Sequence, residues 1–164
     1  MTQEIDIEKY HQLALQKQKE HRKVLANLKK KPPKNLDKIA QEIHDEVFQE
    51  IDCTACANCC KTLGPDFKEA DITRIAKYFK MKLPVFEAEF LQVDEDGDKV
   101  FKSMPCPFLG GDNLCSIYDV RPKACREFPH TDRKKIYQIN HLTIKNTLTC
   151  PAAYLFVEKL KDRL

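Results

Sequence analysis

The sequence predicts an α+β fold, a small and mostly α-helical domain with one short β-hairpin, nucleated by a cysteine-ligated metal site. Three observations predict it: apolar residues recur at the helical period, one acidic glycine-bearing turn separates two extended segments, and eight cysteines lie between residues 53 and 150. With 164 residues the chain suits one domain with an appended arm. We therefore expect a helical basic N-terminal arm at 1–34 and a cysteine-cluster metal-binding domain at 35–164.

The N-terminal stretch to about residue 31 predicts a polar helix, because two short apolar stripes at helical spacing flank a wholly polar stretch, 16–23. One acid, Glu20, stands among eight cations: Lys17, Lys19, Arg22, Lys23, Lys29, Lys30, Lys31 and Lys34. These cations form either a solvated helix face or a contact surface for an acidic protein or nucleic acid. No aromatic residues interleave the charges, so we expect no nucleic acid, while a protein partner through the arm stays open.

A second helix is predicted directly before the cysteines. Two prolines after Lys31 end the first helix, and Asn35 is a suitable N-cap for the next. Apolar residues then recur at the helical period: Leu36, Ile39, Ala40, Ile43, Val47 and Ile51. His44 lies beside this face, which is typical of a hydrogen-bonded interface histidine and not of a metal ligand.

Two short helices and a hairpin are predicted between residues 66 and 102. Asp66 with Glu69 is typical of a capping box, and Pro84 can open a second helix. Extended segments then flank the acidic turn at 94–98, which predicts a hairpin. The turn departs from the calcium-loop pattern, because Gly97 directly follows the second aspartate, so we expect no calcium.

The C-terminal part is expected to place cysteines at helix starts. Pro122 at a first-turn position puts Cys125 on a short helix, and Pro151 puts Cys150 at the N-cap of a C-terminal helix. At an N-cap the helix dipole favours a thiolate. The segment 135–140 is predicted to be extended, either as a second short strand pair or as an edge strand.

The eight cysteines are the expected metal ligands: Cys53, Cys56, Cys59, Cys60, Cys106, Cys115, Cys125 and Cys150. Thiolates select zinc, copper(I) or iron–sulfur clusters, and the C-x-x-C spacing lets two of them reach one metal. Neighbouring side chains point apart, so the adjacent pair Cys59 and Cys60 suits different partners. Eight thiols therefore suit two four-thiolate sites, or one such site with spare thiols.

Four of these ligands are the first choice for one shared metal site: Cys53, Cys56, Cys115 and Cys125. His130 could replace one thiolate. A [4Fe–4S] cluster tolerates ligands spaced as widely as these, whereas structural zinc sites more often show paired C-x-x-C turns. Both cofactors, an iron–sulfur cluster or zinc, stay open.

The cysteine motifs together resemble one family. C-x2-C-x2-C-C at 53–60 is followed by C-P-F-L at 106–109, C-x-I-Y at 115–118, R-P-x-x-C-R-x-F-P at 121–129 and a late C-P at 150–151. This combination resembles the YkgJ-type cysteine-cluster family of small bacterial proteins, also denoted CxxCxxCC and described as chelating zinc or iron. The resemblance implies metal binding, and nothing before residue 53 takes part in it.

Several functions are compatible with this reading. Metal chelation of undefined physiological role comes first. A cluster-dependent enzyme of methyltransferase or redox type is an alternative, since flagellin lysine methylases resemble the same cysteine domain. A purely structural metal site in an interaction protein is another. The sequence lacks the glycine-rich strand-to-helix turn that would indicate a site for a nucleotide-like cofactor. We predict no catalytic residue.

The composition predicts a cytoplasmic protein without a membrane span. Charged residues make up 32% of the chain, and mean hydropathy is −0.54. No apolar run approaches the roughly 18 residues of a membrane helix, and the N-terminus lacks the pattern of a signal peptide. A reducing compartment favours metal ligation over disulfides. The net charge of +3 does not by itself indicate nucleic acid.

Overall fold

The computed structural model describes residues 4–164 and divides into two compact units. Unit 1 comprises Met1–Cys56 and Pro129–Leu164, and unit 2 comprises Ala57–Phe128. The predicted arm at 1–34 therefore falls within unit 1, except that its first three residues lie outside the described part of the chain. Each unit is described by itself.

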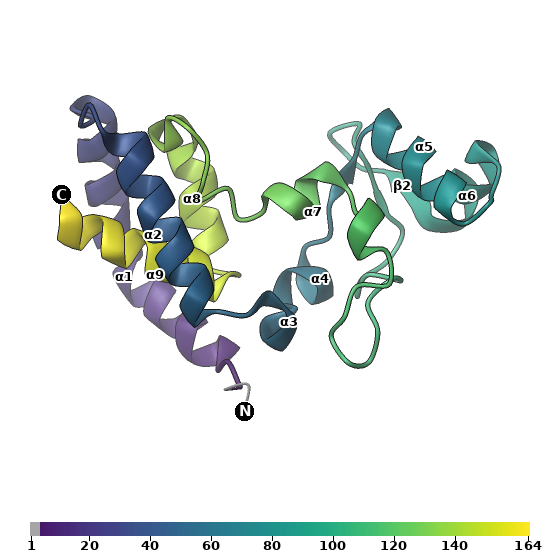
Figure 1. Ribbon diagram of the computed structural model, residues 1–164, viewed down its shortest axis with the longest axis horizontal. Coiled ribbons are helices and arrows are strands. Elements are labelled where there is room, and N and C mark those ends of the chain that lie inside the picture. Colours follow the sequence, from purple (N-terminus) through teal and green to yellow (C-terminus); the bar gives the residue numbers. More distant parts are fainter. Residues whose placement is uncertain (1–3) are drawn as a thin grey trace. The chain divides into compact units, whose positions relative to one another are not determined.

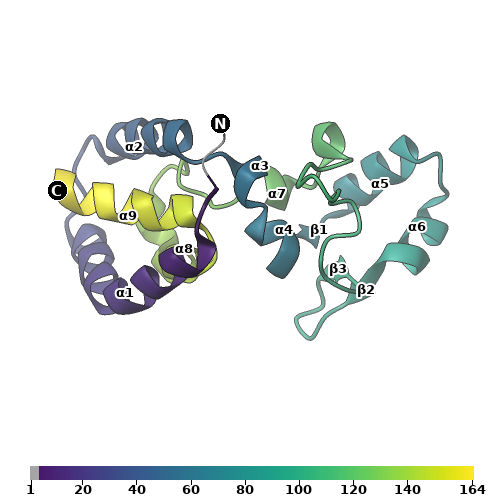
Figure 2. The same ribbon diagram turned by 90° about the horizontal axis from the view of Figure 1, so that it is seen from below.

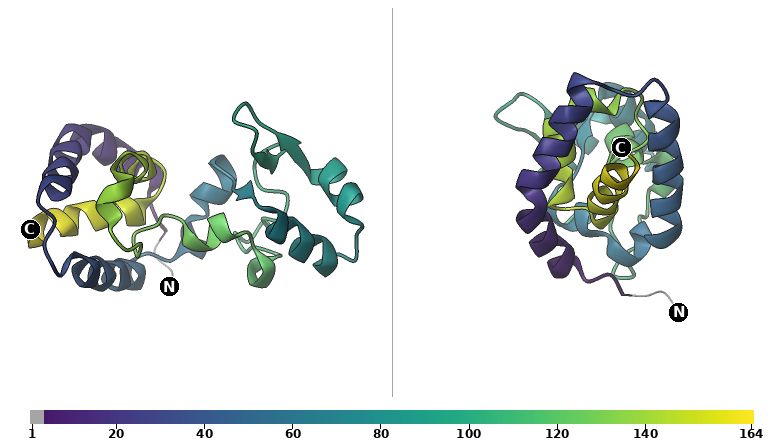
Figure 3. Two further views of the ribbon diagram at one scale, coloured as in Figure 1. Left: turned by 90° about the horizontal axis from the view of Figure 1, so that it is seen from above. Right: turned by 90° about the vertical axis from the view of Figure 1, so that its left-hand side faces the viewer.

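Unit 1 is a bundle of α1 (Ile7–Lys30), α2 (Leu36–Glu50), α8 (Asn140–Thr147) and α9 (Pro151–Arg163). The short helix α3 (Cys53–Cys56) follows α2, and a 3₁₀ turn, η2 (Ile136–Ile139), precedes α8. Helix α9 contacts the other three long helices, and Figures 2 and 3 show it between α1 and α2.

The ends of these helices follow the local sequence. The Asp6 carboxylate accepts the Lys9 N–H at 2.9 Å and caps α1, which ends at Lys30 before the two prolines. Helix α2 begins after Asn35, as predicted. Pro151 opens α9 with Cys150 at its N-cap, which confirms that prediction.

The core of unit 1 is one continuous apolar cluster. It draws buried side chains from each of the four long helices, and Ile43, Phe156, Val157 and Leu160 have no exposed surface. Cys150 packs against this cluster. Ile51, two residues before Cys53, is a member of the cluster. The predicted apolar face of α2 is thus the face that packs.

Unit 2 contains a three-stranded antiparallel sheet of order β1–β3–β2, made of β1 (Asp66–Phe67), β2 (Leu91–Val93) and β3 (Lys99–Phe101). The β2–β3 hairpin confirms the prediction for this segment, with Gly97 at φ +84° in its turn.

Helices α5 (Glu69–Tyr78) and α6 (Leu83–Phe90) contact each other, and α6 contacts β2 (Figure 1). The remaining elements of unit 2 are α4 (Asn58–Thr62), the 3₁₀ turn η1 (Tyr118–Val120) and α7 (Lys123–Glu127).

Two sequence predictions are wrong. Asp66 does not cap a helix but lies in β1, and α5 starts at Glu69, where the Lys68 N–H donates to the Asp71 carboxylate at 3.0 Å. The segment 135–140 is not a strand, because it forms η2 and leads into α8. Its apolar residues Ile136 and Ile139 are buried in the helical core of unit 1, so tertiary packing overrides β-propensity there.

Unit 2 has a smaller core, built mainly on aromatic side chains. Phe108 contacts Phe79, Phe90 and Phe101, with ring centroids 5.0–5.7 Å apart. Cys106 and Cys115 pack against this cluster. Across residues 4–164, no helix has the length and apolar character needed to cross a membrane.

Candidate metal centre

Backbone contacts in unit 2 bring Cys60 and Cys106 together from distant parts of the chain. Cys60 lies on α4, and the Cys106 N–H donates to its carbonyl oxygen at 2.8 Å. Forty-odd residues of sheet and helix separate the two cysteines in sequence, so only the folded unit can make this contact.

Cys106 and Cys115 lie at the two ends of a tight loop. The Leu109 N–H closes a turn on the Cys106 carbonyl at 3.1 Å, and Leu109 pairs with Cys115 in an isolated antiparallel bridge. Backbone N–H groups of Phe108 and Leu109 interact with the Cys106 sulfur, and that of Ile117 interacts with the Cys115 sulfur. Such donors stabilise a thiolate.

Asp71 positions the short helix that carries Cys125. Its buried carboxylate accepts the Lys123 N–H at 3.1 Å, at the first residue of α7. It also accepts Arg74 Nη2 at 2.8 Å. Burial opposes ionisation of this group, but these donors together hold its pKa below the usual range. Sequence analysis missed Asp71, and its place one turn into α5 gave no signal of this role.

The thiols of unit 2 interact electrostatically with one another. Burial, together with the charges of Cys60 and Cys115, raises the pKa of Cys106 to about 11. Part of Cys125 is exposed to solvent, but burial of its sulfur, together with the charges of Cys60, Cys106 and Cys115, raises its pKa to about 12. Cys60, Cys106, Cys115 and Cys125 therefore form one group, called here the unit 2 thiol set.

Cys60 is the most acidic of these thiols. A hydrogen bond with the Cys59 thiol lowers its pKa to about 7, against the opposing effect of burial, and the positive charge of Lys61 helps. The Cys59 thiol thus stabilises the thiolate form of Cys60. The Arg121 guanidinium also favours the thiolates of Cys115 and Cys125, and it stacks on the Tyr118 ring at 3.9 Å.

The remaining cysteines form a second group within unit 1. Burial, together with the charges of Cys53 and Cys56, raises the pKa of Cys150 to about 12, although backbone N–H groups of Ala153 and Ala152 partly offset the rise. Cys53 and Cys56 are the two ends of α3. These three residues are called here the unit 1 thiol set.

A comparison with protein families shows to which family the chain belongs. Residues 52–151 match the family CxxCxxCC, which is described as "Putative zinc- or iron-chelating domain". The chain belongs to the CxxCxxCC family. Comparisons with curated proteins and with solved structures returned no match.

The CxxCxxCC match spans all eight cysteines and confirms the resemblance drawn from the sequence. It supports metal binding by zinc or iron chelation in general terms. It leaves out α1 and α2, so the family signature comprises unit 2 together with those parts of unit 1 that carry cysteines.

The grouping of thiols differs from the one expected from the sequence. Cys115 and Cys125 interact with Cys60 and Cys106 inside unit 2, whereas Cys53 and Cys56 interact with Cys150 inside unit 1. In the described residues, no three His, Cys, Asp or Glu side chains stand close enough to hold a metal ion. Ligation would therefore draw the thiols of a set closer together than they stand here.

Three histidines that could be considered as metal ligands differ in their surroundings. His44 Nδ1 lies 2.8 Å from Thr131 Oγ1 and its ring packs on Phe48, which fits the expected interface role. His130 has a left-handed backbone, φ +66°, and its part as a thiolate substitute stays a prediction. His11, in the predicted arm, was not selected from the sequence.

Proposed function

We propose that this CxxCxxCC protein binds one tetrahedral metal ion, zinc or iron(II), through the unit 2 thiol set, and that the ion stabilises unit 2. The observation that supports this is that backbone contacts within unit 2 join Cys106 to Cys60 and hold Cys115 at the other end of the Cys106 loop, with Cys125 close enough to interact electrostatically with all three. Four thiolates are the donor set of structural zinc sites and also suit iron.

The surroundings of the thiol set fit such an ion. Four thiolates around a divalent cation carry a net charge of −2, which Arg121 and Lys61 partly offset. Backbone N–H groups face the sulfurs of Cys106 and Cys115, as outer partners do in metal sites. Cys60, whose pKa of about 7 is the lowest of the set, would be the first ligand to engage the metal as a thiolate.

We favour a single ion over a cluster because Cys106 stands in a tight turn, with N–H groups aimed at its sulfur, of the kind that structural zinc sites use. A [4Fe–4S] cluster would use the same four thiolates and is an outcome that the test below distinguishes. Free thiolates require a reducing compartment, so we place the protein in the cytoplasm.

The role of the ion is proposed to be structural chelation. The elements of unit 2 are short, and the longest helix within it, α5, has 10 residues. Small units of this kind gain folding free energy from a bound metal. An enzymatic role would need an additional substrate site, and we assign none.

The test compares two serine variants after anaerobic purification. We expect Cys125→Ser to lose one bound ion per chain relative to wild type, because it removes a ligand. Cys59→Ser is the matched control, since it changes an adjacent cysteine that supports Cys60 without belonging to the set, and it should keep the ion with about tenfold weaker affinity. Metal content, acid-labile sulfide and the visible spectrum are measured for each.

Unchanged metal content in Cys125→Ser would refute the thiol set. Iron with equimolar acid-labile sulfide and a broad visible band would replace the single ion by a cluster on the same residues. Colourless protein with stoichiometric zinc is the expected result for wild type.

A further inference from the structure

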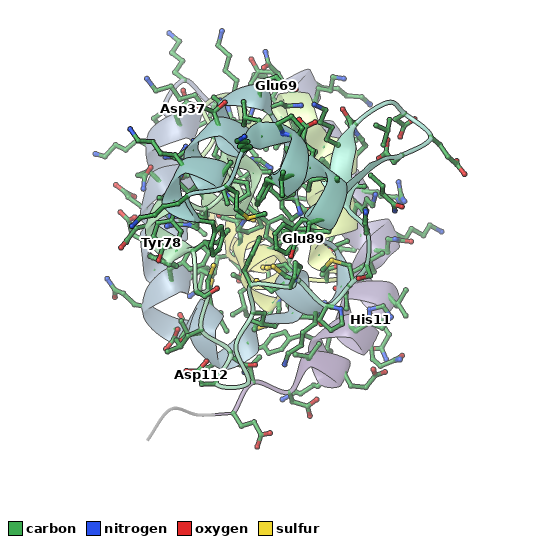
Figure 4. All side chains as sticks on the ribbon, turned by 90° about the vertical axis from the view of Figure 1, so that its right-hand side faces the viewer. His11, Asp37, Glu69, Tyr78, Glu89 and Asp112 are labelled. Atoms are coloured by element: carbon green, nitrogen blue, oxygen red, sulfur yellow. The ribbon has the colours of Figure 1, made fainter. Side chains whose placement is uncertain are left out.

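Unit 2 exposes large apolar side chains where α5 ends and α6 begins. The exposed fractions are 54% for Tyr78, 37% for Phe79, 42% for Leu83 and 51% for Val85. Figure 4 labels Tyr78, the last residue of α5. Exposed apolar side chains grouped in this way typically mark a binding surface. The stretch 77–85, called here the 77–85 surface, contains no cysteine and takes no part in the function proposed above.

The backbone and the core of unit 2 hold the 77–85 surface in place. In the turn that ends α5, the Lys80 N–H donates to the Lys77 carbonyl oxygen at 3.0 Å. The Phe79 ring stacks on the buried Phe108 ring, and the Tyr78 ring packs edge-on against Phe79, with 5.2 Å between centroids in both pairs. The apolar side chains are therefore already positioned, so a partner that binds them loses little free energy in ordering them.

The charge of the 77–85 surface is positive throughout. Lys77, Lys80 and Lys82 are exposed, and their ammonium groups form no ion pair with any residue of the described chain, 4–164. The segment 72–86 contains no acidic residue. The two acids that flank it are neutralised by ion pairs of 2.8 Å, Asp71 with Arg74 and Glu87 with Lys99. The surface therefore combines exposed apolar groups with three uncompensated cations.

This combination fits an anionic phospholipid surface better than a protein or a nucleic acid. Phosphates attract lysines, and the boundary between headgroups and acyl chains accepts aromatic and aliphatic side chains. Protein interfaces are depleted in lysine, which is the only cation within 77–85. Nucleic acid would need free aromatic faces for stacking, but one face of Phe79 is covered by Phe108, and Leu83 and Val85 have no ring.

We propose that the 77–85 surface binds the face of an anionic phospholipid membrane. Leu83 and Val85 enter the boundary between headgroups and acyl chains, and the three lysines extend their long side chains toward the phosphates. The chain lies on the membrane without crossing it. The proposal uses none of the thiols, so it is independent of the metal centre.

The cations at the end of α1 provide the matched control. Lys30 and Lys34 are exposed as well, but no large apolar side chain is exposed between residues 29 and 34. An anionic surface attracts any group of lysines, so a loss of charge alone does not identify a binding surface. The double variant Lys30→Gln and Lys34→Gln removes the same charge as Lys77→Gln and Lys82→Gln, and only the second pair belongs to the 77–85 surface.

The test is co-sedimentation of the full-length chain with lipid vesicles. One set of vesicles contains phosphatidylcholine and phosphatidylglycerol in equal parts, and the other contains phosphatidylcholine alone. A third double variant, Leu83→Gln and Val85→Gln, removes the apolar groups and keeps the charge. Both of its positions are exposed, so its thermal unfolding, followed by circular dichroism, should match that of wild type.

We expect wild type and the Lys30, Lys34 variant to bind the mixed vesicles with equal affinity, and neither to bind phosphatidylcholine alone. The Lys77, Lys82 variant should bind about 25-fold more weakly, about fivefold for each lysine. The Leu83, Val85 variant should bind about tenfold more weakly.

Three results would overturn the proposal. Wild type that stays in solution with the mixed vesicles would exclude membrane binding, and retention of single-stranded oligodeoxythymidine by that protein would assign the surface to nucleic acid. An equal loss of binding in the Lys30, Lys34 variant would mean adsorption by net charge. Unchanged binding of the Leu83, Val85 variant would exclude insertion of the apolar side chains.

A fluorescence measurement reports insertion directly, because the chain contains no tryptophan. The variant Val85→Trp carries a single reporter at the 77–85 surface. Its emission should shift to shorter wavelength with the mixed vesicles and be quenched by brominated lipid. Leu15→Trp, at an exposed position of α1, is the control and should show neither change. Emission of Val85→Trp that does not change when the protein co-sediments with vesicles would overturn the proposed insertion.

Discussion

The two units bury their apolar side chains on very different frameworks. In unit 1 the helix α1 alone runs for 24 residues, and it packs with three other helices around a continuous core. In unit 2 no helix exceeds 10 residues and each strand has two or three, with most of the remainder in turns around the cysteines.

This difference indicates that the units depend on different sources of stability. A bundle whose helices share a continuous apolar core gains most of its folding free energy from burial. A unit of short elements and loops has less surface to bury and relies more on cross-links, here the proposed metal–thiolate bonds. The predictions below test this contrast, from the largest expected effect to the smallest.

Removal of metal should separate the two units most clearly. Structural zinc contributes about 10–16 kcal/mol in small metal-binding domains, so a strong chelator should lower the unfolding free energy of unit 2 far more than that of unit 1. Amide hydrogen exchange, measured by mass spectrometry on the chelated protein, should then become fast across Ala57–Phe128 and stay slow in the cores of α2 and α9. Adding zinc back should restore protection, and equal loss of protection in both units would contradict the contrast.

A cavity made in either core should lower the unfolding free energy by less than removal of the metal does. The two cavities should differ in their effect on metal binding. Phe156 in unit 1 and Phe86 in unit 2 both have no exposed surface. Truncation of either to alanine should cost about 3–5 kcal/mol of unfolding free energy in its own unit. We expect Phe156→Ala to leave the affinity of the unit 2 thiol set for zinc unchanged, and Phe86→Ala to weaken it. Denaturant titration and chelator competition measure the two quantities, and weakening by Phe156→Ala would break the comparison.

The pH dependence of the metal-free protein should be the smallest effect. Burial raises the pKa values of Cys106 and Cys125 from 9.0 to about 11 and about 12. The folded chain therefore keeps protons that the unfolded chain loses above pH 9, so this stability is complete below pH 9 and is lost as pH rises further. Metal-free unit 2 should melt about 5 °C lower at pH 10.5 than at pH 8.

The zinc-loaded protein serves as the control for that measurement, because its ligands are already deprotonated. Its melting temperature should not fall over the same range. A fall of equal size with zinc bound would mean that the titration involves groups other than the thiols.

Local signals in the sequence predicted much of the fold. Proline and asparagine at helix starts located α2, α6 and α9, and the acidic turn around Gly97 located the hairpin. The two failures, β1 and the segment 135–140, are stretches whose structure depends on distant partners. Asp66 pairs with Val100 across the sheet, and Ile136 enters the core of unit 1.

The candidate ligands were predictable as a pool but not as groups. Thiol chemistry and C-x-x-C spacing identify all eight cysteines, yet which of them interact depends on contacts such as Cys106 N–H to Cys60 O. The expectation that Cys59 and Cys60 take different partners stays a prediction, because in this structure the two thiols form a hydrogen bond with each other.

The insertion of unit 2 between α2 and α8 has a consequence for synthesis on the ribosome. All residues of the unit 2 thiol set precede α9 in the chain, so the ribosome has made the complete set before it makes α9. Unit 1 has to wait, because α9, the helix that contacts α1, α2 and α8, follows them in the order of translation. The inserted unit therefore has all its proposed ligands before the bundle around it can close.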